Sequence, residues 1–438
     1  MRKVFLSFLG TSDYLPCNYT CGKKTIFQNI RFVQEATIAY HCSDWMEQDA
    51  IIVFTTEESH QKNWLDNGHK DRDGNMIQLE GLQSRIENMA RPFQINEVRI
   101  GIGKDEAEIW KTFATIMKNI DDGDELYFDI THAFRSLPLL AMVIINYAKV
   151  TKNITVKAID YGALESLGQI TDVRKMEVEE RNVPVFNLLP FDQLLDWTTA
   201  IDGFLIAGNP AGIQKLTTKK ITPVLSETQG KDEEAASLRE MSRCLGTFAE
   251  TMAACRGKEI VKSAKNLQAA VENVRDQELI TPLAPLLVKL KENTASFTGN
   301  EVNDGLAAAK WCLKHNLIQQ GFTLLQETMC SHVLLEVTDV DHYAEKNRNM
   351  VNKAMVIQSE NKSFTEWDKA AQENRSLVEN LCSWFANHKD FKEQLKNIGN
   401  DRNDINHAGI RDNPMAAKKF SDRLGAYTKE FEKYAFTE

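Results

Sequence analysis

The sequence predicts an α/β N-terminal domain, built on a doubly wound and mostly parallel sheet, followed by an all-α C-terminal region. Two observations carry this prediction. In residues 1–190, short apolar runs alternate with helical patterns, which is typical of parallel strands joined by crossover helices. From about Phe191 the strand signals stop, and long stretches with apolar residues at helical spacing follow. A length of 438 residues also exceeds one ordinary core, so two or three domains are expected.

Five short apolar runs are the candidate strands of the sheet. They are Val4–Leu9, Ala50–Thr55, Val98–Ile102, Leu126–Ile130 and Ile154–Ile159. The segment Val173–Leu189 adds one or two closing strands. Each of the first four runs ends in a polar or glycine-containing turn. Because the carboxyl ends of the strands meet at one edge of a doubly wound sheet, we expect these turns to lie together where such folds bind ligands.

The remainder of the chain is predicted to be helical. The longest helical patterns are Glu233–Met252, Ile260–Arg275, Leu306–Glu336 and Ala370–Asn387. Pro282 and Pro285 interrupt this part of the chain. We therefore divide the chain into an α/β domain (residues 1–190), a helical connecting region (191–300) and a C-terminal helical domain (301–438). Whether the connecting region is a separate linker or part of the last domain stays open.

Composition limits the classes of protein that fit. A hydrophobic content of 42% and a charged content of 26% are ordinary for a soluble globular protein. No apolar stretch approaches the roughly 18 residues of a membrane span, so a cytoplasmic protein without a membrane partner is expected. The net charge of −10 argues against wrapping long nucleic acid. Cys17 and Cys21 fit one face of a strand better than a zinc site, and no metal is assigned.

The turn after the fourth strand has the composition of an anion-binding site. It carries hydroxyl, imidazole and guanidinium groups, and the following helix presents its free N–H groups to the same edge of the sheet. The turn after the first strand would lie beside it. The candidate residues of the two turns are Gly10, Thr11, Ser12, Thr131, His132, Arg135 and Ser136. The alternative is that Thr131 and Ser136 only cap the helix and that Arg135 pairs with an exposed acid.

A second group of candidate residues lies in the sequence GNDRNDINH at residues 399–407. Asn400 or Asp401 is predicted to cap a helix, which places Arg402 in the first turn and His407 in the second. Residues five apart are rotated by about 140° on a helix. One helix therefore cannot aim both side chains at one atom, and a second copy of the helix would complete the site.

These residue types suit cleavage of RNA by its own 2′-hydroxyl. His407 can exchange a proton near neutral pH, Arg402 can stabilise the charged phosphorane, and Asn403 can orient the phosphate or the imidazole. Asp401 and Asp404 add acid nearby, which raises the pKa of a histidine or weakens phosphate binding. The alternative is a capped helix with ordinary surface charges.

A polar stripe marks the predicted helix that contains Leu306–Glu336. Asn316, Gln320, Thr323 and Glu327 fall at i, i+4, i+7 and i+11 on an otherwise apolar pattern. Taken alone, such a stripe faces solvent more often than it carries a function.

Several motifs of the first half, in their order and spacing, resemble the CARF domain of type III CRISPR accessory proteins. They are FLGTSDY, NYTCGKKTIFQNIRFVQEAT, VFTTEESHQKNW, IGIGKDEAEIW and FDITHAFRSLP, and they cover most of residues 1–190. The resemblance implies a Rossmann-like sensor domain that dimerises and binds a cyclic oligoadenylate, with cyclic tetra-adenylate as the expected activator. It assigns ligand contacts to Gly10, Thr11, Ser12, Thr131, His132, Arg135 and Ser136.

The polar stripe and the later RNDINH together resemble the HEPN ribonuclease pattern Arg-Asn-x3-His, over roughly residues 301–438. The match is strict at Arg402, Asn403 and His407, to which the resemblance assigns catalysis. It implies a homodimer or higher oligomer in which two protomers form one composite site. That site would cleave single-stranded RNA without a metal or other cofactor and leave a 2′,3′-cyclic phosphate.

The two resemblances predict a Rossmann-like sensor followed by an all-α HEPN domain, acting as a cyclic oligoadenylate-activated endoribonuclease in type III CRISPR antiviral defence. Two alternatives stay open. A CARF transcriptional regulator would need a basic recognition helix, and none stands out in residues 191–438, so no DNA partner is expected. A sensor that mainly degrades cyclic oligoadenylate would use Thr11, Ser12 and His132 as its candidate residues.

Overall fold

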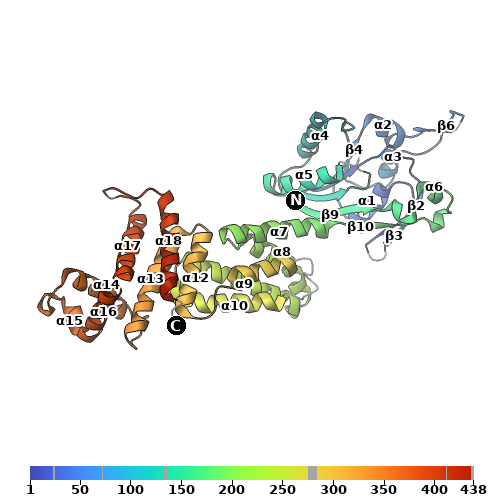
Figure 1. Cartoon of the computed structure of the whole chain (residues 1–438). Coiled ribbons are helices and arrows are strands. Elements are labelled where there is room, and N and C mark those ends of the chain that lie inside the picture. The colour runs from blue at the N-terminus through green and yellow to red at the C-terminus, as the bar shows by residue number, and fades with distance from the viewer. Residues whose placement is uncertain (23–24, 72, 133–136, 275–283, 411, 436–438) are drawn as a thin grey trace. The chain divides into compact units, whose positions relative to one another are not determined.

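The computed structural model describes residues 1–22, 25–71, 73–132, 137–274, 284–410 and 412–435 (Figure 1). By their internal contacts, the residues divide into two compact units, Met1–Gln193 and Leu194–Glu438. The first unit holds the sheet with its helices and the second is helical. The predicted fold class, α/β followed by all-α, is therefore confirmed. No helix in the described ranges is long and apolar enough to cross a membrane.

The main sheet of the first unit has the strand order β3-β2-β10-β9-β8-β1-β4-β7. Its parallel part consists of β9 (Thr155–Gly162), β8 (Glu125–Asp129), β1 (Lys3–Phe8), β4 (Ala50–Thr55) and β7 (Gln94–Arg99). Each of these strands corresponds to one predicted strand. β1 is flanked by β4 on one side and by β8 on the other, so the direction of winding reverses between β1 and β8. Doubly wound sheets bind ligands at this switch point.

Strand β7 begins earlier than the sequence predicts. The apolar run Val98–Ile102 predicts a strand that starts at Val98, but β7 is Gln94–Arg99 and pairs over its whole length with β4. β7 is the last strand of the sheet, so several of its side chains are exposed and polar. Hydrophobicity alone therefore marks only the end of such an edge strand.

The opposite edge of the sheet is mixed. β10 (Asn182–Asn187) runs antiparallel to β9, β2 (Cys17–Cys21) runs parallel to β10, and β3 (Thr25–Ile30) returns antiparallel to β2. The predicted closing region Val173–Leu189 thus contains one strand. Cys17 and Cys21 are both buried in the apolar cluster beneath this edge, as expected for two residues on one face of a strand.

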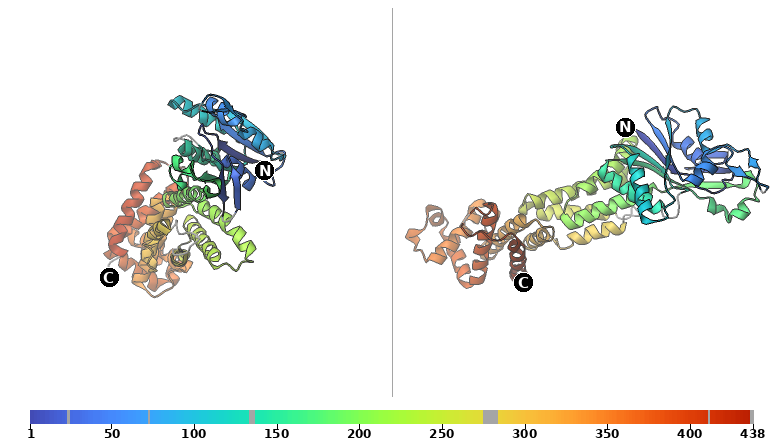
Figure 2. Two further views of the ribbon diagram at one scale, coloured as in Figure 1. Left: turned by 90° about the vertical axis from the view of Figure 1, so that its right-hand side faces the viewer. Right: turned by 90° about the horizontal axis from the view of Figure 1, so that it is seen from above.

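Helices cover both faces of the parallel strands (Figures 1 and 2). Alternate residues of β1 enter opposite apolar clusters: Val4 and Leu6 pack with α4 (Glu106–Lys118) and α5 (Leu137–Thr151). Phe5 packs on the other side, with α1 (Val33–His41) and α3 (Leu82–Glu87). This two-sided burial explains why the central strands read as nearly continuous apolar runs.

The second unit contains two apolar clusters. The helices of the first cluster are α7 (Leu189–Ala207), α8 (Ala211–Glu227), α9 (Glu233–Ala253), α10 (Ile260–Val274) and α11 (Ala284–Thr294). The helices of the second are α14 (Glu345–Glu360), α16 (Arg375–Asn387), α17 (Lys389–Asn406) and α18 (Lys418–Ala435). α12 (Glu301–Lys314) and α13 (Ile318–Val337) contribute to both clusters, so they join the two halves of this unit.

Two predicted helices are each divided into two. Leu306–Glu336 is interrupted between α12 and α13, where Asn316 adopts a left-handed backbone with a φ of 58°. Ala370–Asn387 is interrupted at Asn374, between α15 (Lys369–Glu373) and α16. Breaks of three residues (between α12 and α13) and of one residue (between α15 and α16) hardly disturb the apolar spacing of a pattern, and at Asn316 asparagine accepts the left-handed conformation at low cost. Asn316 is thus not part of the helical polar stripe, which corrects that prediction.

Candidate functional site

The first candidate site lies where β1 and β8 end side by side. Ser7 of β1 is paired with Asp129 of β8, and the Ser7 hydroxyl donates a 2.8 Å hydrogen bond to the Asp129 carboxylate. Asp129 also accepts hydrogen bonds from the N–H and the hydroxyl of Thr131, at 3.0 and 2.5 Å. Full burial raises the pKa of Asp129 to about 6. This carboxyl group therefore fixes the turn that carries Thr131.

Gly10 brings the turn after β1 against His132. Its N–H donates a 2.8 Å hydrogen bond to the Tyr14 hydroxyl oxygen, and the Tyr14 and His132 rings meet edge to face with centroids 4.4 Å apart. A Cβ atom at position 10 would lie 3.2 Å from the Tyr14 hydroxyl and 3.4 Å from His132 Cβ. The sequence prediction that the two turns lie together is confirmed, and the close contact explains the glycine.

His132 is neutral at physiological pH. Burial lowers the pKa of its imidazole to about 4, because charging the ring would require solvation that the surroundings do not supply. Its Nε2 atom is buried and has no hydrogen-bond partner among the described residues. An unsatisfied ring nitrogen beside a cavity is suited to hydrogen bonding with a ligand.

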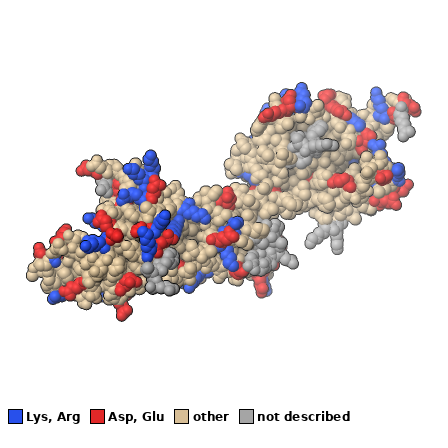
Figure 3. Space-filling model, viewed as in Figure 1, with Lys and Arg blue, Asp and Glu red and all other residues tan. Residues whose placement is uncertain are grey.

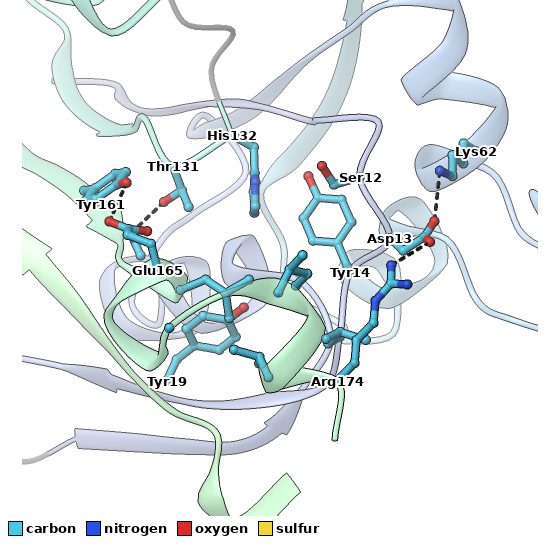
Figure 4. Close-up of a pocket in the computed structure, with 16 residues that line it drawn as sticks. Ser12, Asp13, Tyr14, Tyr19, Lys62, Thr131, His132, Tyr161, Glu165 and Arg174 are labelled. Carbon is cyan, nitrogen blue, oxygen red and sulfur yellow. Dashed lines mark hydrogen bonds and ion pairs between the residues drawn. The ribbon is translucent and has the colours of Figure 1, made fainter. Parts of the chain in front are cut away.

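A cavity of about 620 Å³ opens at these two turns (Figure 4). Ser12, Thr131 and His132, three of the predicted ligand residues, line it. Gly10 packs beside His132, and the Thr11 carbonyl accepts a 2.8 Å hydrogen bond from Lys62. The predictions for the remaining two residues, Arg135 and Ser136, fall outside the described part of the chain.

The cavity has a charged wall that the sequence analysis missed. Lys62 Nζ lies 2.9 Å from one oxygen of Asp13, and Arg174 Nη2 lies 3.1 Å from the other. The hydrogen bond from Lys62 keeps the pKa of Asp13 below its usual range. Two cations thus share one carboxylate, which leaves this group of three side chains positive, while Glu165 adds a carboxylate elsewhere in the lining. Lys62 and Arg174 come from segments far apart in the sequence, so no local pattern connects them.

The second candidate site is the C-terminal end of α17, and here the structure corrects a prediction. A helix start at Asn400 or Asp401 is wrong, because α17 begins at Lys389 and continues to Asn406. Its apolar residues Phe391, Leu395 and Ile398 are buried in the second cluster. This burial holds the helix together across the glycine and asparagine that otherwise favour a break.

The three motif residues therefore lie at the end of a helix. Arg402 lies in the last turns of α17 and His407 directly follows the helix, where its N–H donates a 2.9 Å hydrogen bond to the Asn403 carbonyl. Asn403 and His407 are exposed, and Arg402 is half-buried. Arg402 Nη1 lies 3.6 Å from Glu327 Oε1 of α13. Its buried Nε has no hydrogen-bond partner in the part of the chain that the structure describes.

The two acids beside the motif have partners of their own. Asp401 accepts hydrogen bonds from Arg423 Nε at 2.6 Å and from the Tyr427 hydroxyl at 2.9 Å. Asp404 accepts one from the Met415 N–H at 2.9 Å. Both carboxylates are buried, and they bind α18 and the segment that precedes it. Their direct role is therefore to hold the end of α17 in place.

The helical part of the polar stripe lies on α13. Thr323 and Glu327 line a second cavity of about 360 Å³, and Glu327 also contacts Arg402. Gln320, one turn earlier, directs its amide toward the Ala253 carbonyl at 3.5 Å. The structure thus brings two of the four stripe residues to a cavity next to the motif.

Together, the switch-point cavity and the helical unit define a class of protein: an α/β domain with a ligand-sized cavity at its switch point, followed by a helical region. Residues 4–165 match the family model described as "CRISPR system endoribonuclease Csx1, CARF domain". The chain is also 26% identical over 317 residues to "CRISPR-associated protein MJ1674" of Methanocaldococcus jannaschii. That match covers 70% of this chain and 44% of the relative, so the chain spans less than half of the relative's length.

These similarities identify the protein more closely. Residues 4–165 of the N-terminal unit are thus similar to a CARF domain, and the chain as a whole is similar to a CRISPR-associated protein. The predicted resemblance to CARF domains is confirmed for residues 4–165. The family model ends at residue 165, before the helical unit begins. The match to the family model therefore does not extend to the helical unit.

Proposed function

We propose that the protein is a cyclic oligoadenylate-activated, metal-independent endoribonuclease that cleaves single-stranded RNA in type III CRISPR antiviral defence. The observation that carries this proposal is the placement of Arg402-Asn403-x3-His407 at an accessible helix end, with an exposed imidazole. A structural histidine would more often be buried among apolar residues. Residues 301–438 would form the HEPN domain and residues 191–300 the region connecting it to the sensor, residues 1–190.

The cavity of the CARF domain supports a cyclic oligonucleotide as the activator. Its volume lies within the roughly 300–1,000 Å³ of ligand pockets. Lys62 and Arg174 would attract phosphates, and His132 Nε2 and the hydroxyls of Ser12 and Thr131 would bind sugar or base atoms. We propose cyclic tetra-adenylate as the ligand, which would extend over two cavities in a homodimer.

An exposed apolar face on α5 supports the homodimer. Leu139, Val143, Tyr147 and Val150 recur at helical spacing and are between 51% and 83% exposed. Such a continuous apolar stripe on a helix usually marks an interaction surface. A homodimer with two-fold symmetry would bury this apolar face of α5 in both copies.

The proposed cleavage uses the substrate's own nucleophile. One His407 accepts the proton of a 2′-hydroxyl, whose oxygen bonds to phosphorus while the bond from phosphorus to the 5′ oxygen breaks. The leaving 5′ oxygen takes up a proton, which gives a 5′-hydroxyl and a 2′,3′-cyclic phosphate. Arg402 stabilises the added negative charge of the phosphorane, and Asn403 orients the phosphate. In Figure 3, Lys and Arg side chains, interspersed with Asp and Glu, lie on the helical unit around α17 and α18, where the cations would attract RNA phosphates.

Activation is proposed to be a population shift. The ligand must bind the dimer in which the two His407 side chains meet more tightly than the resting form, since only a difference in affinity can move the equilibrium.

The test is a fluorescent single-stranded RNA assay in EDTA, with cyclic tri-, tetra- or hexa-adenylate as activator. Wild-type protein should cleave with cyclic tetra-adenylate, and Arg402→Ala and His407→Ala should lose at least about 100-fold in rate. An absolute need for a divalent metal, or full activity of His407→Ala, would overturn the proposed mechanism.

A further inference from the structure

The cavity next to Arg402 is built from four separate segments of the helical unit. Gly257 and Lys258 come from the turn before α10, Glu301 from α12, Glu327 from α13, and Tyr343 from the segment before α14. Its volume of about 360 Å³ falls at the lower end of the range for small-ligand pockets. The space is therefore suited to one nucleotide-sized group.

Part of the cavity wall is fixed by a dense polar network. Arg348 donates to Glu327 Oε2 from Nε at 3.0 Å and from Nη2 at 2.6 Å, and from Nη1 to Ser331 Oγ at 2.9 Å. His342 Nε2 lies 2.7 Å from Glu301. The hydrogen-bonding groups of these side chains are occupied by one another, so the side chains form a rigid wall and are not free to bind a ligand.

Lys258 lies outside this network, whereas Tyr343 borders it, because its hydroxyl forms a hydrogen bond with Glu301 and its ring centroid lies 4.2 Å from that of His342. Lys258 is exposed, and no carboxylate pairs with it within the described ranges; its Nζ lies 5.3 Å from the centroid of the Tyr343 ring. Tyr343 is 36% exposed, so its ring is accessible from the cavity. A free cation beside an accessible aromatic ring is the combination that proteins use to bind single-stranded nucleic acid.

The cavity is connected directly to the proposed catalytic motif. Glu327 lines the cavity and also lies 3.6 Å from Arg402. Cys255, another lining residue, is near Arg402 as well: burial raises the pKa of its thiol, and the positive charge of Arg402 opposes that effect. A phosphodiester held by Arg402 would thus have its neighbouring nucleotide within reach of the cavity.

We infer that this cavity is a subsite for one nucleotide of the RNA substrate beside the scissile phosphate, with the Tyr343 ring under the base and Lys258 on a phosphate. The inference rests on the proposed ribonuclease function. The subsite positions RNA and takes no part in bond breaking, so its residues act on RNA affinity and on the choice of the cleaved bond.

The experiment measures RNA affinity in a chain that cannot cleave. Full-length His407→Ala protein is titrated into a fluorescein-labelled, mixed-sequence single-stranded RNA decamer, with cyclic tetra-adenylate present, and anisotropy gives Kd at several salt concentrations. Adding Lys258→Ala should raise Kd about 5–10-fold and lower the salt slope by about 0.7, the value for one lost phosphate contact on a single strand. Adding Tyr343→Leu should raise Kd by about 5-fold or more without changing the slope.

Two matched variants separate binding from folding. Tyr343→Phe keeps the ring and loses only the hydroxyl, so its Kd should stay within about 2-fold of the parent. Lys369→Ala removes a lysine from α15 whose side chain is 89% exposed and which does not line the cavity, and it should leave Kd unchanged. Thermal unfolding of each variant reports any loss of fold.

The outcomes distinguish this inference from the proposed function. Unchanged Kd values in Lys258→Ala and Tyr343→Leu, while wild-type protein cleaves RNA, would overturn the subsite alone. Weakened binding in both variants, with no cleavage by wild-type protein, would support the subsite as an RNA site and overturn the ribonuclease. No RNA binding by the parent would overturn both.

Discussion

Arg402 Nη1 lies 3.6 Å from Glu327 Oε1, and the other oxygen of Glu327 accepts two hydrogen bonds from Arg348. One carboxylate on α13 thus holds two guanidinium groups, one structural and one in the proposed catalytic motif. Arg402 comes from α17, so this pair also fixes the motif relative to α13.

We predict that Glu327→Gln lowers the rate of RNA cleavage about 10-fold with little change in KM. The amide keeps the shape of the side chain but holds Arg402 less firmly, and a misplaced cation weakens stabilisation of the transition state. Stability should fall by about 1 kcal/mol, because Glu327 is half exposed and Arg348 keeps its other partners. Kinetics and thermal unfolding, with Lys369→Ala as control, check this; unchanged kcat would contradict it.

We predict that Lys62→Ala and Arg174→Ala each weaken binding of cyclic tetra-adenylate about 10-fold. Each removes one cation from the wall of the CARF cavity, and a charge-assisted hydrogen bond to phosphate contributes roughly 1.5–3 kcal/mol. Lys175→Ala is the matched control, since its side chain is 78% exposed and does not line the cavity. Isothermal titration calorimetry gives the three affinities; equal loss in the control would mean that only the net charge matters.

The CARF domain should show two opposing dependences of stability on pH. Asp129 has its pKa raised to about 6, so its contribution to stability is complete below about pH 4 and is lost as the pH rises through 6. His132 has its pKa lowered to about 4, so its contribution is complete above about pH 6.5 and is lost as the pH falls through 4. Each amounts to about 3 kcal/mol, and in the wild-type protein they largely cancel.

Single substitutions should reveal each dependence. Asp129→Asn should leave only the pH dependence of stability that is due to His132, so that the melting temperature rises between pH 4 and 6.5. His132→Phe should leave only the pH dependence of stability that is due to Asp129, so that the melting temperature falls between pH 4 and 6. Differential scanning calorimetry at several pH values measures both trends, and the same slope in the two variants would contradict the assignment.

We predict that Val143→Asp breaks the proposed dimer of CARF domains. The side chain is 51% exposed in the middle of the apolar face of α5, so aspartate costs the single chain little but places two like charges in a two-fold interface. Analytical ultracentrifugation should show monomers, and cyclic tetra-adenylate should no longer stimulate cleavage. Asn146→Asp, on a half-buried residue of the same helix, controls for the added charge.

Much of the parallel sheet was predictable because β1, β4, β8 and β9 are buried on both faces and therefore read as apolar runs. The carboxyl ends of the strands of a doubly wound sheet meet at one edge, so the turns after β1 and β8 could be predicted to lie together. The structure places Ser12, Thr131 and His132 of these turns at one cavity. The charged wall of Lys62 and Arg174 was not predictable, since it forms only through tertiary contacts. The continuous helix through Gly399 was missed because buried apolar residues outweigh local helix propensity.

The pairing of Ser7 with Asp129 joins residues 122 positions apart, so the sensor cavity cannot exist until β8 has been synthesised and docked against β1. On the ribosome, that condition is met while most of the helical unit is still to be translated. Under the proposed function, a nascent chain would therefore form the strands that carry the activator site before the residues that would cleave RNA have been translated.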